Sequence, residues 1–212
     1  MTSVNDLGAN FKTCARLVKQ AKQIGCNIVF FPECASLSAS SDRHVDSQLA
    51  PYTQLARDHD VWLSLGGFQE RCEGNERIYN THVVVDNMGC IQATYRKIHL
   101  YDVPMVGLVE SKQARGASVV ACDSPVGRLG VTICYDMRFP ELYQKLTFLH
   151  GAEVLLMPSA FAVKTGQAHW ETLLRCRAIE TQCYVVAAAQ AGQHNEDGNK
   201  RCSYGHAMVF DP

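Results

Sequence analysis

The sequence predicts an α/β protein with mixed sheets. Three observations support this: short apolar runs that end at glycine or proline, amphipathic segments of helical spacing between them, and one pair of adjacent strands joined by a turn. Alternating strands and helices favour parallel pairing, whereas a hairpin places antiparallel strands side by side. The 212 residues fit a single domain.

The first half of the chain supplies helices and strands in alternation, and then a hairpin. Pro32 stops the first apolar run, and Gly66 with Gly67 is expected to end the second strand. The residues Asp86 to Gly89 suit the hairpin turn. The expected elements are a helix over 10–24, a strand over 27–31, a helix over 49–58, and strands over 61–65, 78–85 and 90–95.

The second half continues the alternation of strands and helices. Pro158 ends one of its strands, and Asn195 to Arg201 form a polar loop. The expected elements are a strand over 129–133, a helix over 139–149, a strand over 154–157, a helix over 168–182 and a strand over 184–189.

Composition excludes several classes of function. With 47% hydrophobic residues, 19% charged residues and a net charge of −1, the chain should be globular and should bind neither nucleic acid nor a membrane surface. Small molecules are the expected partners. The ten cysteines include no Cys-x-x-Cys pair, so no structural metal site is expected. No signal-peptide pattern opens the chain, so we expect reduced thiols and a cytoplasmic location.

Three reactive side chains follow predicted strands directly. Glu33, Lys97 and Cys134 each stand where a strand ends. Because the carboxyl ends of strands in an open sheet line one cleft, these side chains should meet there.

Each of the three residues also has a plain structural interpretation. Cys134 can be a small buried apolar side chain, or a thiol whose pKa a helix N-terminus and Arg138 lower. Glu33 can cap a turn, or act as a partly desolvated general base. Lys97 can be solvated, or stabilise the oxyanion of a tetrahedral intermediate.

Longer motifs around these residues resemble the nitrilase superfamily. They are Phe31-Pro32-Glu33, Tyr95-Arg96-Lys97-Ile98-His99-Leu100 and the run from Cys134 to Glu141. Further segments resemble the deaminated glutathione amidase branch of that superfamily. These are Trp62 to Phe68, Pro158 to Phe161, His169-Trp170-Glu171 and Arg177 to Tyr184.

The resemblance implies a four-layer α-β-β-α sandwich of the carbon-nitrogen hydrolase type and a Glu33, Lys97 and Cys134 triad. It implies that Glu110 positions Lys97 or assists proton transfer, and that the backbone N–H of Tyr135 binds the oxyanion. The implied reaction is amide hydrolysis through a thioester, without metal or organic cofactor. The implied substrate is glutathione whose amino group a transaminase has removed, so the reaction would be metabolite repair.

The resemblance also suggests residues near the substrate and between subunits. Phe161, Thr165 and His169 lie in stretches that the family places at the substrate, although Phe161 also fits core packing. The helix over 168–182 fits either the core or the subunit contacts of a homo-oligomer, a dimer or tetramer.

Relative to the family, the chain is expected to be a single carbon-nitrogen hydrolase domain over 1–212, incomplete at both ends. It apparently lacks the first strand and the C-terminal strands, and a missing N-terminal segment would leave an organelle open as its location. Two alternatives stay open: an omega-amidase acting on alpha-ketoglutaramate, and a catalytically incompetent truncated homologue that acts as a binding subunit.

Overall fold

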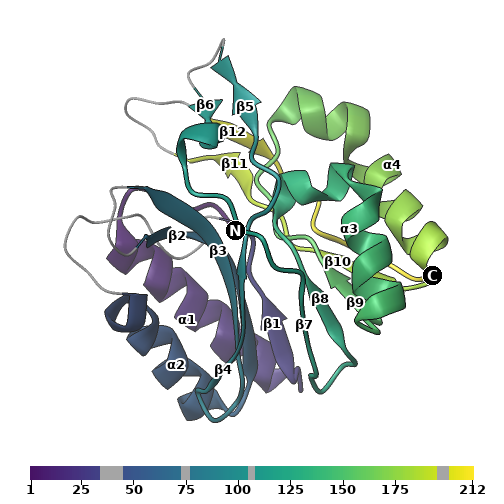
Figure 1. The fold of residues 1–212 in the computed structure, drawn as a ribbon. Coiled ribbons are helices and arrows are strands. Elements are labelled where there is room, and N and C mark those ends of the chain that lie inside the picture. The colour runs from purple at the N-terminus through teal and green to yellow at the C-terminus, as the bar shows by residue number, and fades with distance from the viewer. Residues whose placement is uncertain (34–44, 73–76, 105–107, 195–200) are drawn as a thin grey trace.

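The structure, a computed structural model, describes residues 1–33, 45–72, 77–104, 108–194 and 201–212. It has four layers (Figure 1). Helices α1 (Leu7–Gln23) and α2 (Val45–His59) cover one sheet, while α3 (Pro140–Gln144) and α4 (Val163–Thr181) cover the other. The two sheets pack against each other between the helical layers. This arrangement confirms the predicted α-β-β-α sandwich.

The first sheet has the strand order β1-β2-β3-β4 within the described ranges. Strand β1 (Ile28–Phe30) pairs in parallel with β2 (Trp62–Arg71). Strands β3 (Ile78–Val85) and β4 (Ile91–Arg96) then continue antiparallel. The predicted hairpin between β3 and β4 is confirmed.

The prediction that Gly66 and Gly67 end the second strand is wrong. Strand β2 continues to Arg71, and its register against β3 shifts between Ser64 and Gly67. Gly66 has a φ of +63°, and a Cβ atom there would lie 2.3 Å from the carbonyl oxygen of Pro32. The two glycines therefore form a bulge, and the missing side chain of Gly66 lets the backbone that follows β1 approach β2 closely.

The second sheet is mixed, as predicted. In the described part of the chain its order is β13-β10-β9-β8-β7. The three central strands are parallel and both edge strands pair antiparallel. The five strands are β7 (Val120–Cys122), β8 (Leu129–Val131), β9 (Val154–Leu156), β10 (Tyr184–Ala187) and β13 (Met208–Phe210). Smaller ladders join β5 (Asp102–Val103) to β6 (Leu108–Val109), and β11 (Ala191–Gln193) to β12 (Cys202–Tyr204).

All four predicted helices begin or end at other residues in the structure, as the two in the second half of the chain illustrate. A 3-10 helix η3 (Cys134–Arg138) precedes α3, and a π-helical turn η4 (Lys145–Leu149) follows it. Helix α4 begins at Val163, before the predicted start, and contains Gly166. Gly166 is tolerated because the Tyr204 ring occupies the place of its Cβ atom. Of the predicted loop Asn195 to Arg201, all but Arg201 lies outside the described residues.

An apolar layer joins the inner faces of the sheets. The first sheet contributes Val84, Ala93 and Tyr95, and the second contributes Leu129 and Ile133, all at most 6% exposed. This layer holds the end of β4 against the chain that follows β8. Among the described helices, none combines the length and apolar character that crossing a membrane requires.

Candidate functional site

The structure brings Glu33, Lys97 and Cys134 together at the seam between the two sheets. Glu33 follows β1 and Lys97 follows β4, both of the first sheet, whereas Cys134 follows β8 of the second. Lys97 Nζ lies 3.5 Å from Glu33 Oε1, and the Cys134 thiol hydrogen-bonds to the Glu33 carboxylate. A thiol, a carboxylate and an ammonium in contact can perform nucleophilic acyl transfer.

Two amide side chains hold Glu33 in place. Asn80 Nδ2 donates to Glu33 Oε1 at 2.9 Å, and Gln190 Nε2 donates to the backbone carbonyl of Glu33 at 3.0 Å. The Glu33 side chain is only 6% exposed. Its carboxylate therefore has little freedom to turn away from Cys134.

Glu110 forms a second ion pair with Lys97, which fits the role as partner of that lysine that the family resemblance implies. Lys97 Nζ donates to Glu110 Oε2 at 2.8 Å and to Oε1 at 3.2 Å. The 3-10 helix η2 (Glu110–Lys112) presents this carboxylate, which also accepts from the backbone N–H of Tyr101 at 2.8 Å. The buried ammonium is thus held between two carboxylates.

Cys134 stands in a strained turn. Its φ is +46°, in the left-handed region that a residue with a Cβ atom seldom occupies. Its backbone N–H donates to the carbonyl of Pro158 at 2.9 Å. Such strain persists where the surrounding structure enforces it, and it is concentrated at active sites.

Asp136 enforces that turn. Its fully buried carboxylate accepts from the Tyr95 hydroxyl at 2.6 Å and from the backbone N–H groups of His99 and Ile133 at 3.0 Å each. The His99 ring lies 2.7 Å from the same carboxylate. One side chain therefore ties the segment that carries Lys97 to the residue before Cys134.

At this site the neutral Cys134 thiol lies beside the ionised Glu33 carboxylate and the Lys97 ammonium. Burial raises the pKa of the Cys134 thiol, and the Glu33 carboxylate raises it further, against the opposing effect of Lys97. Burial would raise the pKa of Glu33, but Lys97 and hydrogen bonds from Cys134 and Asn80 bring it below its ordinary value. The expectation of a lowered thiol pKa is wrong, because burial and Glu33 outweigh the short helix η3.

The two flanking groups follow the same electrostatics. Burial would lower the pKa of Lys97, yet Glu33, Cys134 and Glu110 together raise it above its usual range. Burial raises the pKa of Glu110, and Glu33 adds to this effect while Lys97 opposes it. At neutral pH the lysine is an ammonium, so it can stabilise negative charge.

Tyr135 comes directly after Cys134 in η3, and its oxyanion role stays a prediction. Its ring packs against Tyr101, with centroids 4.8 Å apart, and against Phe139 at 5.4 Å. The guanidinium of Arg138 lies 5.9 Å from the Tyr135 ring centre. These contacts fix the backbone next to the thiol.

The residues suggested for substrate binding lie in different surroundings, and their role stays a prediction. Phe161 is buried and packs edge-on against Trp170 at 5.0 Å, which fits its alternative interpretation as core. Thr165 is half-buried on α4. The exposed His169 accepts from Arg138 through Nδ1 at 3.0 Å.

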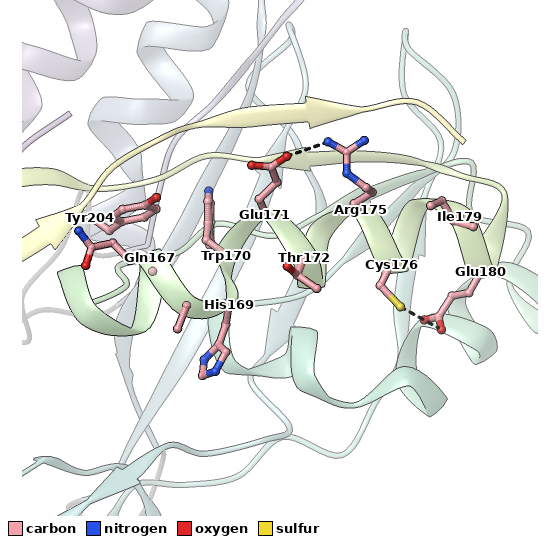
Figure 2. A pocket seen from close by; sticks show the side chains of 12 residues that line it. Gln167, His169, Trp170, Glu171, Thr172, Arg175, Cys176, Ile179, Glu180 and Tyr204 are labelled. Carbon is pink, nitrogen blue, oxygen red and sulfur yellow. Dashed lines mark hydrogen bonds and ion pairs between the residues drawn. The ribbon is translucent and has the colours of Figure 1, made fainter.

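A hollow of about 520 Å³ runs along α4 and is separate from the triad (Figure 2). Its lining includes His169, Trp170 and Arg175, and does not include Cys134. In Figure 2, His169 projects from α4 on a different side from Glu171 and Arg175. Among the described residues, no group of three or more His, Cys, Asp or Glu side chains could hold a metal ion.

Sequence reasoning missed Asn80, Gln190 and Asp136. Asn80 and His82 are polar residues in a strand that is otherwise apolar, aromatic or β-branched, and a polar side chain at such a position is a signal of a buried hydrogen bond. Asp136 lies inside the motif that begins at Cys134, but its contacts to Tyr95 and His99 come from another part of the chain.

Comparison with known proteins agrees with this geometry. The family model described as carbon-nitrogen hydrolase matches residues 1–212. The deaminated glutathione amidases of Bos taurus and Homo sapiens are each 49% identical to the chain over 228 residues, covering all of it and 68% of their own length. That of Dictyostelium discoideum is 43% identical and is covered over 78%.

Solved structures show the same fold. The NitFhit protein of C. elegans superposes with a TM-score of 0.87 at 43% identity, covering all of this chain and 54% of the other. Nit3 of Saccharomyces cerevisiae, a member of the nitrilase superfamily, gives a TM-score of 0.83 at 29% identity, covering 99% of this chain and 79% of that one. The chain thus spans about half of the fusion protein.

Proposed function

The chain belongs to the carbon-nitrogen hydrolase family, within the nitrilase superfamily, and on that premise we propose that it hydrolyses the amide of deaminated glutathione with Cys134 as nucleophile. It is a hydrolase of carbon-nitrogen bonds other than peptide bonds, in linear amides. The observation that carries the catalytic assignment is the thiol of Cys134 in contact with the Glu33 carboxylate, with the Lys97 ammonium beside it.

The first half of the reaction forms a thioester. Glu33 takes the proton of the Cys134 thiol as the sulfur attacks the amide carbon. Lys97 and the backbone N–H of Tyr135 stabilise the negative charge on the former carbonyl oxygen. When the tetrahedral intermediate collapses, Glu33 returns the proton to the leaving nitrogen, and ammonia departs.

The second half of the reaction restores the enzyme. Glu33 takes a proton from water, the hydroxyl oxygen attacks the thioester carbon, and the carbon-sulfur bond breaks. The thiolate recovers the proton and the carboxylic acid leaves. Glu110 keeps the Lys97 ammonium in position throughout, since it makes the shorter of the two ion pairs with that lysine.

The choice of substrate is supported by the similarity to amidases of that name at 43–49% identity. The test is ammonia release by the purified chain from deaminated glutathione and from alpha-ketoglutaramate. A higher kcat/KM for the first substrate supports the proposal. A clear preference for alpha-ketoglutaramate would replace the proposed substrate.

The nucleophile is tested with Cys134→Ala and a matched control. Cys122→Ala removes another largely buried thiol, which lies on strand β7 away from the triad. We expect Cys134→Ala to lose at least about a thousandfold in rate, because covalent catalysis needs the sulfur, while Cys122→Ala keeps its rate. Equal rates for Cys134→Ala and the parent would remove the assignment.

Two properties of the whole protein stay predictions. A homo-oligomer is checked by light scattering on the purified protein, and a monomer there would contradict it. A cytoplasmic location is checked by imaging a tagged full chain in cells, where an organellar signal would contradict it.

A further inference from the structure

Asn80 touches two of the three triad residues through different atoms. Its backbone carbonyl accepts from the Lys97 N–H at 2.8 Å, which extends the β3–β4 pairing by one residue. Its side-chain Nδ2 donates to Glu33 Oε1 at 2.9 Å. The residue is 8% exposed. A single position of β3 therefore contacts both the carboxylate of the candidate base and the backbone that carries the lysine.

The geometry permits one orientation of the Asn80 amide. A carboxylate oxygen only accepts hydrogen bonds, so the NH2 group must face Glu33. The oxygen Oδ1 then packs over Gly67, where an added Cβ atom would lie 2.4 Å from Oδ1 and 3.1 Å from Glu33 Cγ. The missing side chain of Gly67 thus provides the space that Asn80 and Glu33 share.

Four titratable or charged groups act on Glu33. Lys97 and the Cys134 thiol contact it, Glu110 acts across Lys97, and Arg201 contributes a weaker attraction. Lys97 attracts the Glu33 carboxylate as a point charge from 3.5 Å. Asn80 supplies a directional hydrogen bond that a point charge cannot replace.

We propose that Asn80 is a positioning residue, which holds the Glu33 carboxylate in the orientation that faces the Cys134 thiol. This inference rests on the proposed function. Asn80 acts through Glu33 and does not touch the reacting atoms. Its counterpart is Gly67, whose lack of a side chain lets the amide reach this orientation.

The test uses Asn80→Ala and Asn80→Asp with Thr81→Ala as the matched control. Thr81 is the next residue of β3, is fully buried, and donates to another buried carboxylate, Glu70 Oε2, at 2.6 Å. Side chains alternate across a strand, so Thr81 faces away from the site. Each substitution removes one buried hydrogen bond to a carboxylate, but only those at Asn80 reach Glu33.

We expect kcat/KM for amide hydrolysis to fall about 10- to 100-fold in Asn80→Ala, with KM nearly unchanged. The acidic limb of the pH–rate profile should move to higher pH, because the hydrogen bond favours the ionised carboxylate. Asn80→Asp keeps the shape of the side chain but replaces its N–H donor with a second carboxylate. It should therefore move the acidic limb further toward higher pH than Asn80→Ala does. Thr81→Ala should lower stability and keep both rate and profile.

Unchanged profiles in both Asn80 variants would overturn the inference, as would an equal shift in Thr81→Ala. If Asn80→Asp were milder than Asn80→Ala, the role would be packing alone, and the inference would also fall. Should the parent release no ammonia, the proposed function fails, and the inference is then read from iodoacetamide alkylation of Cys134, measured on its peptide. The pH at which Cys134 becomes alkylated must then rise in Asn80→Asp but not in Thr81→Ala. An unchanged pH profile of alkylation in Asn80→Asp would refute the inference.

Discussion

Mild acid should destabilise this protein through His82. The ring is fully buried between the sheets, with Nδ1 2.9 Å from the carbonyl of Thr132 and Nε2 2.7 Å from the Ser64 hydroxyl. Since a carbonyl only accepts, Nδ1 carries the proton and Nε2 accepts from Ser64. Burial lowers the pKa of His82 to about 4, although the bond to Thr132 partly opposes this effect.

The sign and size of the effect follow from proton linkage. Between the ordinary pKa of histidine, about 6.5, and the folded value of about 4, the unfolded chain binds a proton that the folded protein does not. The stabilisation is therefore complete above about pH 6.5 and is lost as the pH falls toward 4. At about 1.4 kcal/mol per pKa unit, His82 accounts for a loss of about 2 kcal/mol by pH 5.

Urea unfolding measured by circular dichroism between about pH 7.5 and about pH 5 tests this, with His82→Asn as comparison. The free energy of unfolding of the parent should fall by about 2 kcal/mol more than that of the variant. Groups such as Glu70, whose pKa is lowered against burial mainly by Arg96, titrate in both proteins and cancel. Equal pH slopes in the two proteins would refute the reasoning, whatever their absolute stabilities.

Three further outcomes follow from the site and its surroundings. Glu110→Gln should lower kcat about 10- to 100-fold with little change in KM, because Lys97 loses its closer carboxylate; steady-state kinetics check this, and a change in KM alone contradicts it. Gly66→Ala should lower the midpoint of urea unfolding far more than Gly25→Ala. Both glycines have positive φ, but only at Gly66 would the added Cβ atom lie 2.3 Å from a backbone oxygen. Equal midpoints in the two variants would contradict the expected clash. Asp136→Asn should reduce both thermal stability and activity, because at least one N–H or O–H donor of the turn loses its acceptor; an active variant of parental melting temperature would show that another group holds the turn.

Much of the fold was predictable because its signals are local. Apolar runs and helical stripes predicted most helices and strands, and the hairpin turn predicted the antiparallel pair β3–β4. The glycine pair in β2 misled because a bulge and a strand end look alike in sequence. Only the pairing with β3 and the approach of Pro32 distinguish them.

The site was predictable in part for a different reason. Strand-end placement and motif resemblance singled out Glu33, Lys97 and Cys134, and the structure brings them together. The direction of the thiol pKa was not predictable, because burial depends on packing between distant segments. Asn80 escaped notice for the same reason: it meets Glu33 across 47 positions of sequence.

The triad is divided between the two sheets, so the rate of catalysis depends on how the two sheets are aligned. Glu33 and Lys97 belong to the first sheet, whereas Cys134 belongs to the second. Positioned catalysis tolerates displacements of about 0.5 Å, while neighbouring residues of a strand are about 3.3 Å apart. If one sheet moved over the other by a small fraction of the spacing between neighbouring residues, the enzyme would therefore lose its activity, although every helix and strand stayed intact. A loss of turnover rate should therefore reveal a change in the packing between the sheets before circular dichroism detects any loss of secondary structure.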